Sequence, residues 1–257
     1  MWNCPNFLAL PARDSKPRHR GLTHVLDKGM PTATLEALLA QAGGFVDVVK
    51  IGWGIGYVDP TVKDRVAMCN AAGVVVCLGG TLLEVCAVQG RVDELRRWAA
   101  DVGVDAVEVS NGLQAMTSSR KTDLVRSLSA DFTVLAETGA KDDDAPVVTE
   151  SWLAEMEADL NAGASWVIAE GRESGTVGLY HDDGRVRAGL VEGIAGRLPL
   201  DRVIFEAPRK AQQTWFIRRF GADVNLGNVP PDEVLPLETL RLGLRADTAV
   251  TDVGARR

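Results

Sequence analysis

The sequence repeats one pattern, a short apolar run that ends in glycine or polar residues and is followed by a stretch with helical spacing. Short apolar runs bounded in this way are typical of strands that are covered on both faces. We expect strands over residues 22–26, 46–51, 74–78, 105–109, 132–136, 165–169, 202–205 and 223–226. We expect helices over about 31–42, 60–72, 91–102, 118–128, 149–161, 186–196, 209–220 and 231–244.

Strict alternation of strands and helices demands parallel strands joined by right-handed crossovers. Eight such units match a closed (β/α)8 TIM barrel, which we predict as a single domain over residues 21–245. An open doubly wound sheet is the alternative, but no strand is followed by the GxGxxG fingerprint common in such sheets. Residues 1–20 are expected to form an N-terminal arm, and residues 246–257, which lack helical periodicity, a flexible C-terminal tail.

Composition limits the partners of this fold. The chain has 257 residues, 46% hydrophobic and 25% charged, with a formal net charge of −7 and no basic stripe that could neutralise a phosphate backbone. No apolar run approaches the roughly 20 residues needed to span a bilayer. The charges of the N-terminus follow its apolar residues, unlike those of a signal peptide. We therefore predict a cytoplasmic protein without nucleic-acid or membrane partners.

Acidic residues stand at the ends of four successive strands. Barrel chemistry takes place at the carboxyl ends of the strands, and side chains alternate along each strand. In residues 106–110 the valines should face the helices, so that Glu108 points into the barrel mouth. Thr133, Leu135 and Glu137 share one parity, as do Ile204 and Glu206. The glutamates expected to converge at the mouth are Glu108, Glu137, Glu170 and Glu206.

So many carboxylates at short range raise one another's pKa unless a cation compensates. Oxygen-rich clusters suit Mg²⁺, which favours carboxylates, water and phosphorylated substrates. The alternative is that nearby cations pair the glutamates off as structural salt bridges. These cations are Lys28, Lys50, Lys141 and Arg172.

Two glycine-containing loops are candidates for a phosphate site, because each runs into a helix N-terminus, where free N–H groups attract anions. One follows the third strand and contains Gly79 and Gly80, and the other follows the eighth strand. The residues expected to contribute from the second loop are Asn225, Gly227 and Asn228. An ordinary helix-capping turn is the alternative for either loop.

The strand ends also form a recognisable set of short motifs. They are Arg20-Gly21-Leu22-Thr23 with Asp27-Lys28-Gly29, Val49-Lys50-Ile51-Gly52-Trp53-Gly54, Gly79-Gly80-Thr81-Leu82, Glu108-Val109-Ser110-Asn111-Gly112, Glu170-Gly171-Arg172-Glu173-Ser174-Gly175, Glu206-Ala207-Pro208 and Val224-Asn225-Leu226-Gly227-Asn228. Together they resemble the phosphosulfolactate synthase family over about residues 11–248. Two positions depart from the family pattern: Asn111, where members often carry an acid, and Thr138, where valine is expected.

The resemblance implies a (β/α)8 lyase that adds sulfite to C3 of phosphoenolpyruvate with Mg²⁺, giving (2R)-phospho-3-sulfolactate, and it suggests a homo-oligomer. The metal ligands would come from the four strand-end glutamates, and Glu170 would be part of the catalytic centre. A lysine whose pKa is lowered by burial and neighbouring cations would protonate C2; Lys141 and Lys50 are the candidates. The side chains expected to hold phosphate and draw in sulfite are Lys28, Arg172 and either Arg209 or Lys210.

Three other functions are compatible with the residues. A family member could join a different nucleophile to phosphoenolpyruvate. A barrel lyase or aldolase could act on another phosphorylated substrate through a Schiff base at Lys50. A non-catalytic barrel could serve as a binding or stress-related protein, although such a barrel would have no need to keep so many charges at its strand ends.

Overall fold

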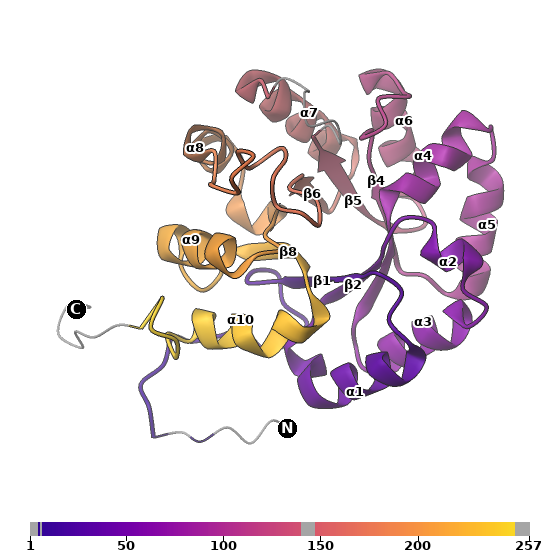
Figure 1. Cartoon of the computed structure of the whole chain (residues 1–257). Coiled ribbons are helices and arrows are strands. Elements are labelled where there is room, and N and C mark those ends of the chain that lie inside the picture. Colours follow the sequence, from indigo (N-terminus) through magenta and orange to yellow (C-terminus); the bar gives the residue numbers. More distant parts are fainter. Residues whose placement is uncertain (1–4, 6, 140–146, 250–257) are drawn as a thin grey trace.

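Eight parallel strands pair in sequence order and close into a barrel, with β8 pairing to β1. Helices surround the barrel on the outside (Figure 1). This computed structural model describes residues 5, 7–139 and 147–249. The strands are β1 (Thr23–Asp27), β2 (Val48–Ile51), β3 (Val75–Leu78), β4 (Ala106–Val109), β5 (Thr133–Thr138), β6 (Trp166–Ala169), β7 (Val203–Glu206) and β8 (Asn225–Val229). The predicted single-domain (β/α)8 fold is therefore confirmed.

The helices begin and end where local chemistry favours it. The Thr117 hydroxyl accepts a hydrogen bond from the Arg120 N–H and so caps one helix. Gly103 and Gly163, both with positive φ, end two others. The helices are α1 (Thr32–Ala42), α2 (Ile55–Val58), α3 (Val62–Ala71), α4 (Gly80–Val88), α5 (Val92–Val102), α6 (Ser118–Leu128), α7 (Thr149–Ala162), α8 (Ala188–Arg197), α9 (Lys210–Phe220) and α10 (Val234–Arg241), with 3₁₀ turns η1 (Gly43–Phe45), η2 (Leu200–Arg202) and η3 (Pro231–Glu233).

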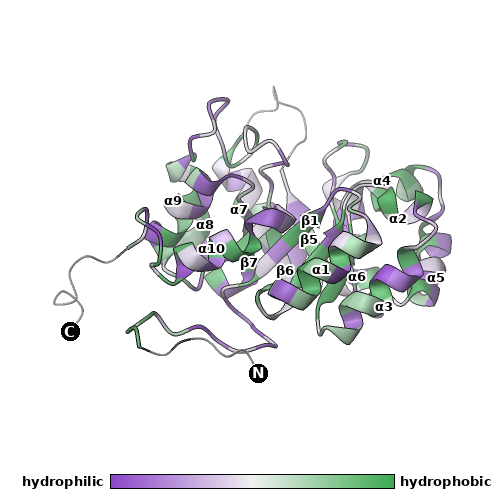
Figure 2. Ribbon diagram, turned by 60° about the horizontal axis from the view of Figure 1, so that its bottom comes forward, coloured by the Kyte–Doolittle hydropathy of each residue, from purple (hydrophilic) through white to green (hydrophobic). Residues whose placement is uncertain are grey.

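Apolar residues form two layers, one on each side of the strands. Outward-facing residues such as Val107 and Val109 pack against the helices, while Leu135, Ile168 and Ile204 belong to a smaller cluster inside the barrel. Figure 2 shows that the helices carry both hydrophobic and hydrophilic residues. The inner cluster fills the barrel below its mouth, and the polar side chains of the mouth lie above it.

The segment before β1 is attached to the amino end of the barrel by ion pairs. Arg13 Nε lies 3.0 Å from Glu238 Oε1, and Arg18 pairs with Asp47 at 3.0 Å. The expected C-terminal tail is described only as far as residue 249. Among the described helices, none combines the length and the apolarity that crossing a bilayer requires.

The structure differs from the sequence-based prediction in two connections. After β3 the chain forms two helices, α4 and α5, where a single helix over residues 91–102 was predicted. The short helix α2 follows β2 and was not predicted. The expected excursion at residues 181–184 is present, closed by an antiparallel bridge between Tyr180 and Val186.

Candidate active site

The alternation of side chains along each strand places a polar layer directly above the inner apolar cluster. Ala106, Leu135 and Ile204 lie in the cluster, and the residues two positions later are glutamates. A pocket opens at this level, at the carboxyl end of the barrel. Its lining residues are Leu26, Lys50, Gly52, Trp53, Gly79, Gly80, Thr81, Glu108, Glu137, Glu170, Arg172, Glu173, Glu206 and Asn228. All four predicted glutamates therefore reach the mouth.

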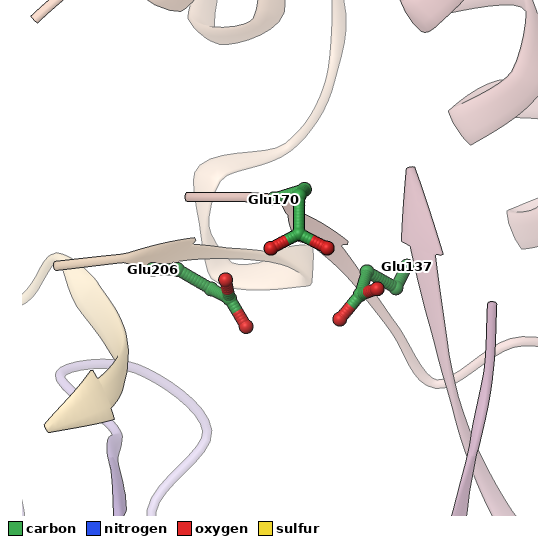
Figure 3. Close-up of side chains that lie close together, drawn as sticks. All are labelled: Glu137, Glu170 and Glu206. Carbon is green, nitrogen blue, oxygen red and sulfur yellow. The ribbon is translucent and has the colours of Figure 1, made fainter. Parts of the chain in front are cut away.

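Three of these glutamates form a close group that we call the glutamate triad: Glu137, Glu170 and Glu206. They come from the ends of β5, β6 and β7, and their carboxyl groups face one another (Figure 3). One carboxylate oxygen from each lies within 4.8 Å of the other two. All three side chains are buried. This donor set, three carboxylates with no nitrogen or sulfur, fits Mg²⁺.

Glu108 lies to one side of the triad and has a different role. One of its oxygens accepts from the Gly80 N–H at 2.8 Å, and the other accepts from Lys50 Nζ at 2.8 Å. The first N–H of α4, expected to bind phosphate, is thus already occupied by a side chain. Glu108 therefore joins α4 to the lysine in the pocket floor.

Lys50 lies among the carboxylates, 3.0 Å from Glu206 Oε1 and 3.8 Å from Glu137 Oε2 as well as 2.8 Å from Glu108. Burial favours the neutral amine, but Glu108, Glu206 and Glu137 outweigh it and raise the pKa of Lys50 well above its usual value. The sequence-based expectation of a lowered pKa is wrong for Lys50, because its neighbours are anions. Its ammonium remains charged at neutral pH.

The two carboxylate oxygens of Glu170 have different surroundings. Its Oε1 accepts from the Arg172 N–H at 2.7 Å, whereas its buried Oε2 receives no hydrogen bond from the described residues. Burial, together with the charges of Glu137 and Glu206, raises the pKa of Glu170 well above its usual value. These surroundings therefore favour the protonated form of this carboxyl group, and an added cation would favour its ionised form.

Unusual backbone conformations surround the pocket. Trp53, Arg172 and Asn228 have φ values of 50°, 57° and 51°, in the left-handed region that non-glycine residues rarely adopt. In this conformation the Arg172 N–H points at Glu170 and also at Glu206 Oε2, 3.0 Å away. Asn228 is buried, and its Oδ1 has no hydrogen-bond partner among the described residues. Such strain is concentrated at functional sites.

Several predicted substrate-binding residues lie away from the pocket. Asn225 begins β8, so it is at the amino end of the barrel, where its amide donates to the Val203 carbonyl at 3.1 Å. Gly227 packs inside the barrel, where a Cβ would come within 2.9 Å of Ile204 Cγ2. Lys28 is exposed beyond β1, outside the lining. These three placements correct the sequence-based expectation.

The cations at the start of α9 also face elsewhere. Arg209 is exposed beside Gly184, and Lys210 is exposed and pairs with Asp247 at 2.7 Å. They stand beyond the loop that follows β7, outside the ring of strand ends, and this corrects their assignment to the phosphate site. Lys141 lies outside the described residues. The two departures from the family pattern, Asn111 and Thr138, are not lining residues of the pocket either.

Sequence reasoning missed two buried residues that touch the main chain of the triad. Lys121 Nζ donates to the Glu137 carbonyl at 2.7 Å, and the Tyr180 hydroxyl donates to the Glu206 carbonyl. Lys121 shares its helical spacing with Leu124, Val125 and Leu128, the apolar face of α6. A charged residue on an apolar face was the signal that could have revealed it.

Known proteins resemble this chain over nearly its whole length. The family model described as (2R)-phospho-3-sulfolactate synthase (ComA) matches residues 11–247. The phosphosulfolactate synthase of Methanothermobacter thermautotrophicus is 41% identical over 252 residues, which cover 96% of this chain and 97% of that protein. The phosphosulfolactate synthase of Bacillus subtilis is 38% identical over 244 residues, covering 94% and 97%.

Solved structures agree on the architecture. Orotidine 5′-phosphate decarboxylase from Pyrococcus horikoshii OT3 matches with a TM-score of 0.58 at 11% identity, covering 84% of this chain and 98% of that one. At this identity the likeness concerns the fold alone. The fold, the cluster of strand-end carboxylates and the relatives over nearly the full length agree, and this chain belongs to the (2R)-phospho-3-sulfolactate synthase family.

Proposed function

We propose that this protein is a lyase that adds sulfite to C3 of phosphoenolpyruvate, using Mg²⁺, to give (2R)-phospho-3-sulfolactate. The observation that carries the proposal is the glutamate triad, three buried carboxylates within 4.8 Å beside a charged lysine, in a member of this family. The raised pKa of Glu170 supports a cation at the triad, because a divalent ion would offset the burial and the repulsion that raise it.

The reaction forms one carbon–sulfur bond and one carbon–hydrogen bond. The sulfur lone pair of sulfite attacks C3, the π electrons of the double bond move to C2 and the carboxylate, and a proton is then delivered to C2. Mg²⁺ held by Glu137, Glu170 and Glu206 would supply charge neutralisation for the carboxylate. The phosphate ester stays intact, so the pocket must bind it without polarising its bridging oxygen.

The residues around the triad can position and protonate the substrate. Lys50 keeps its proton on Nζ inside the pocket and is a candidate donor to C2; Lys141 remains the other. Arg172 lines the pocket and is the cation that we assign to phosphate or sulfite. Because both reactants are anions, such a cation would reduce their mutual repulsion.

The alternative imine mechanism fits Lys50 poorly. An amine must be neutral to attack a carbonyl, whereas Glu108, Glu206 and Glu137 keep the pKa of Lys50 high. Borohydride should therefore trap no adduct at Lys50 when it is added with small phosphorylated aldehydes or ketones. A mass increase on Lys50 after borohydride would favour the Schiff-base lyase.

Substitution of the triad tests the proposal. Glu137→Gln or Glu170→Gln removes a negative charge with little change of shape. We expect each to lower the turnover of sulfite and phosphoenolpyruvate by at least ~100-fold, on the order of what a lost transition-state charge contact costs. The matched control is Glu36→Gln, an exposed residue of α1 that should leave the rate unchanged. A folded Glu170→Gln variant with the wild-type rate would refute the metal assignment.

A further inference from the structure

The main-chain carbonyls of the glutamate triad accept hydrogen bonds from segments outside the barrel strands. Each glutamate stands at or beside the end of its strand, since β5 ends at Thr138, β6 at Ala169 and β7 at Glu206. Buried carbonyls need hydrogen-bond partners, and partners beyond a strand end must come from other segments. The three carbonyls receive theirs from α6 and from the loop that joins β6 to α8.

Lys121 binds the main-chain carbonyl of Glu137. Its ammonium, on α6, donates to the Glu137 carbonyl at 2.7 Å, to Glu155 Oε1 at 2.5 Å and to Asp159 Oδ2 at 2.7 Å. These three bonds use all three donors of the ammonium. The side chain of Lys121 is 1% exposed. Burying an ammonium costs free energy even when it is paired. If Lys121 served only to link α6 to α7, apolar residues would do so at a lower cost in free energy.

The loop between β6 and α8 holds the other two glutamates through adjacent residues. The Leu179 N–H donates to the Glu170 carbonyl at 2.9 Å, and the Tyr180 hydroxyl donates to the Glu206 carbonyl. Tyr180 is fully buried, with its ring against Gly171, where a Cβ would lie 2.6 Å from Cε2. The ring and the hydroxyl thus fix the distance between the ends of β6 and β7.

We propose that Tyr180 and Lys121 are positioning residues that set the spacing of the three triad carboxylates for a divalent cation. This inference rests on the proposed function, since it concerns the same site. Neither side chain lines the pocket, so each acts through the backbone of a glutamate. Loss of an outer partner of a metal ligand typically costs 10–100-fold in metal affinity.

Binding of Mn²⁺ alone, measured from the electron paramagnetic resonance signal of the free ion, tests the proposal without turnover. Tyr180→Phe removes one oxygen and keeps the ring, and we expect it to raise the Mn²⁺ Kd by about 10-fold or more. The matched control is Tyr57→Phe at the chain's other tyrosine, which is exposed on α2. The KM for Mg²⁺ should rise in Tyr180→Phe while that for phosphoenolpyruvate stays within about twofold.

Lys121→Met provides a second, independent test. Its matched control is Asp159→Asn, which weakens the tie to α7 but leaves the donor to the Glu137 carbonyl in place. We expect Lys121→Met to raise the Mn²⁺ Kd by about 10-fold or more, and Asp159→Asn to change it less than about twofold.

Three other results would contradict the positioning role or the metal site. If folded Tyr180→Phe and Lys121→Met bind Mn²⁺ as tightly as the wild type, neither residue positions the triad. Equal weakening in Lys121→Met and Asp159→Asn would make Lys121 a structural tie only. If the wild-type protein leaves Mn²⁺ free in solution, the metal centre of the proposed function falls, and the positioning role with it.

Discussion

Individual charges around the pocket determine what it can bind. Four carboxyl groups, those of Glu108, Glu137, Glu170 and Glu206, are at most 3% exposed, and Lys50 lies among them. Burial and the charges of Glu137 and Glu206 raise the pKa of Glu170 well above its usual value. A divalent cation at the pocket floor, as proposed, would favour the ionised form of Glu170, and the proposed anionic substrate would then be bound at the rim.

His24, buried inside the barrel, makes stability depend on pH. Burial, aided by the charge of Lys50, lowers the pKa of His24 from 6.5 to about 3. Between these values the unfolded chain binds a proton that the folded protein refuses, so the free energy of unfolding falls as the pH falls. The contribution of His24 should shrink by about 1.4 kcal/mol between pH 7.5 and 5.5.

Urea unfolding of the wild type and of His24→Gln at these two pH values measures this effect. The wild type should lose about 1.4 kcal/mol more than the variant. Carboxyl groups titrate in both proteins, so the difference isolates His24. Equal losses in the two proteins would mean that His24 is protonated in the folded state.

The sequence could predict which side chains share a strand parity but not how far along the strand the pocket lies. Glu137 and Glu206 were placed correctly because each stands two positions after an inward apolar residue. Asn225 shares the parity of Gly227 yet lies at the opposite end of the barrel, because β8 begins there. The predicted positions of Lys28 and Lys210 were wrong for another reason. Both residues lie past a strand end, where the direction of a side chain is no longer fixed by the alternation along the strand.

Among the elements, the loop between β6 and α8 contributes most to the site. It provides Arg172 to the pocket, and its Gly178 approaches the Glu170 carbonyl with a φ of 59°. A Cβ at Gly178 would overlap that oxygen. The loop therefore packs closely against the end of β6, so that a change in the conformation of the loop should displace the end of the strand.

Alanine at Gly178 should disturb both folding and the site. The positive φ and the overlap should together cost about 1–3 kcal/mol, and the displaced Glu170 should lower turnover. The matched control is Gly196→Ala, in α8, where an added Cβ meets nothing within 4 Å and should be neutral or stabilising. Chemical unfolding and sulfite consumption measure the two effects. A Gly178→Ala protein as stable and active as the control would contradict the close contact.

The elements themselves were predictable because eight repeats of one pattern leave few topologies. The exceptions, α2 and α4, follow glycine-rich strand ends that were interpreted as loops. Helix α4 begins with Gly80, whose N–H binds Glu108, so a tertiary contact supports a start that local propensity does not favour.

In the molecule as a whole, the ion pairs of the N-terminal segment and the acidic pocket lie at opposite ends of the barrel. Arg13 and Arg18 join the N-terminal segment to the amino end of the barrel, where Asn225 also links β8 to β7, while the acidic pocket occupies the carboxyl end. The two ends are separated by the inner apolar cluster. Substitutions at the mouth can therefore change function while the fold persists.

Metal binding at the mouth should stabilise the entire domain, because a ligand that binds only the folded state shifts the unfolding equilibrium. At a Mg²⁺ concentration 100 times its Kd, we expect about 2.7 kcal/mol of added stability. Thermal unfolding with Mg²⁺ and then with excess EDTA measures this gain and its reversal. Glu170→Gln should lose most of the shift. An equal shift in that variant would point to a cation site elsewhere.

Phosphorus NMR of the purified protein with phosphoenolpyruvate tests the central claim most directly. With Mg²⁺ and sulfite together, we expect the phosphoenolpyruvate signal to be replaced by that of a new phosphate ester, and EDTA to stop the conversion. Without sulfite, the phosphoenolpyruvate signal should persist. Binding of phosphoenolpyruvate without conversion would contradict sulfite as the nucleophile, and a spectrum unaffected by the protein would contradict the assignment of this pocket to phosphoenolpyruvate.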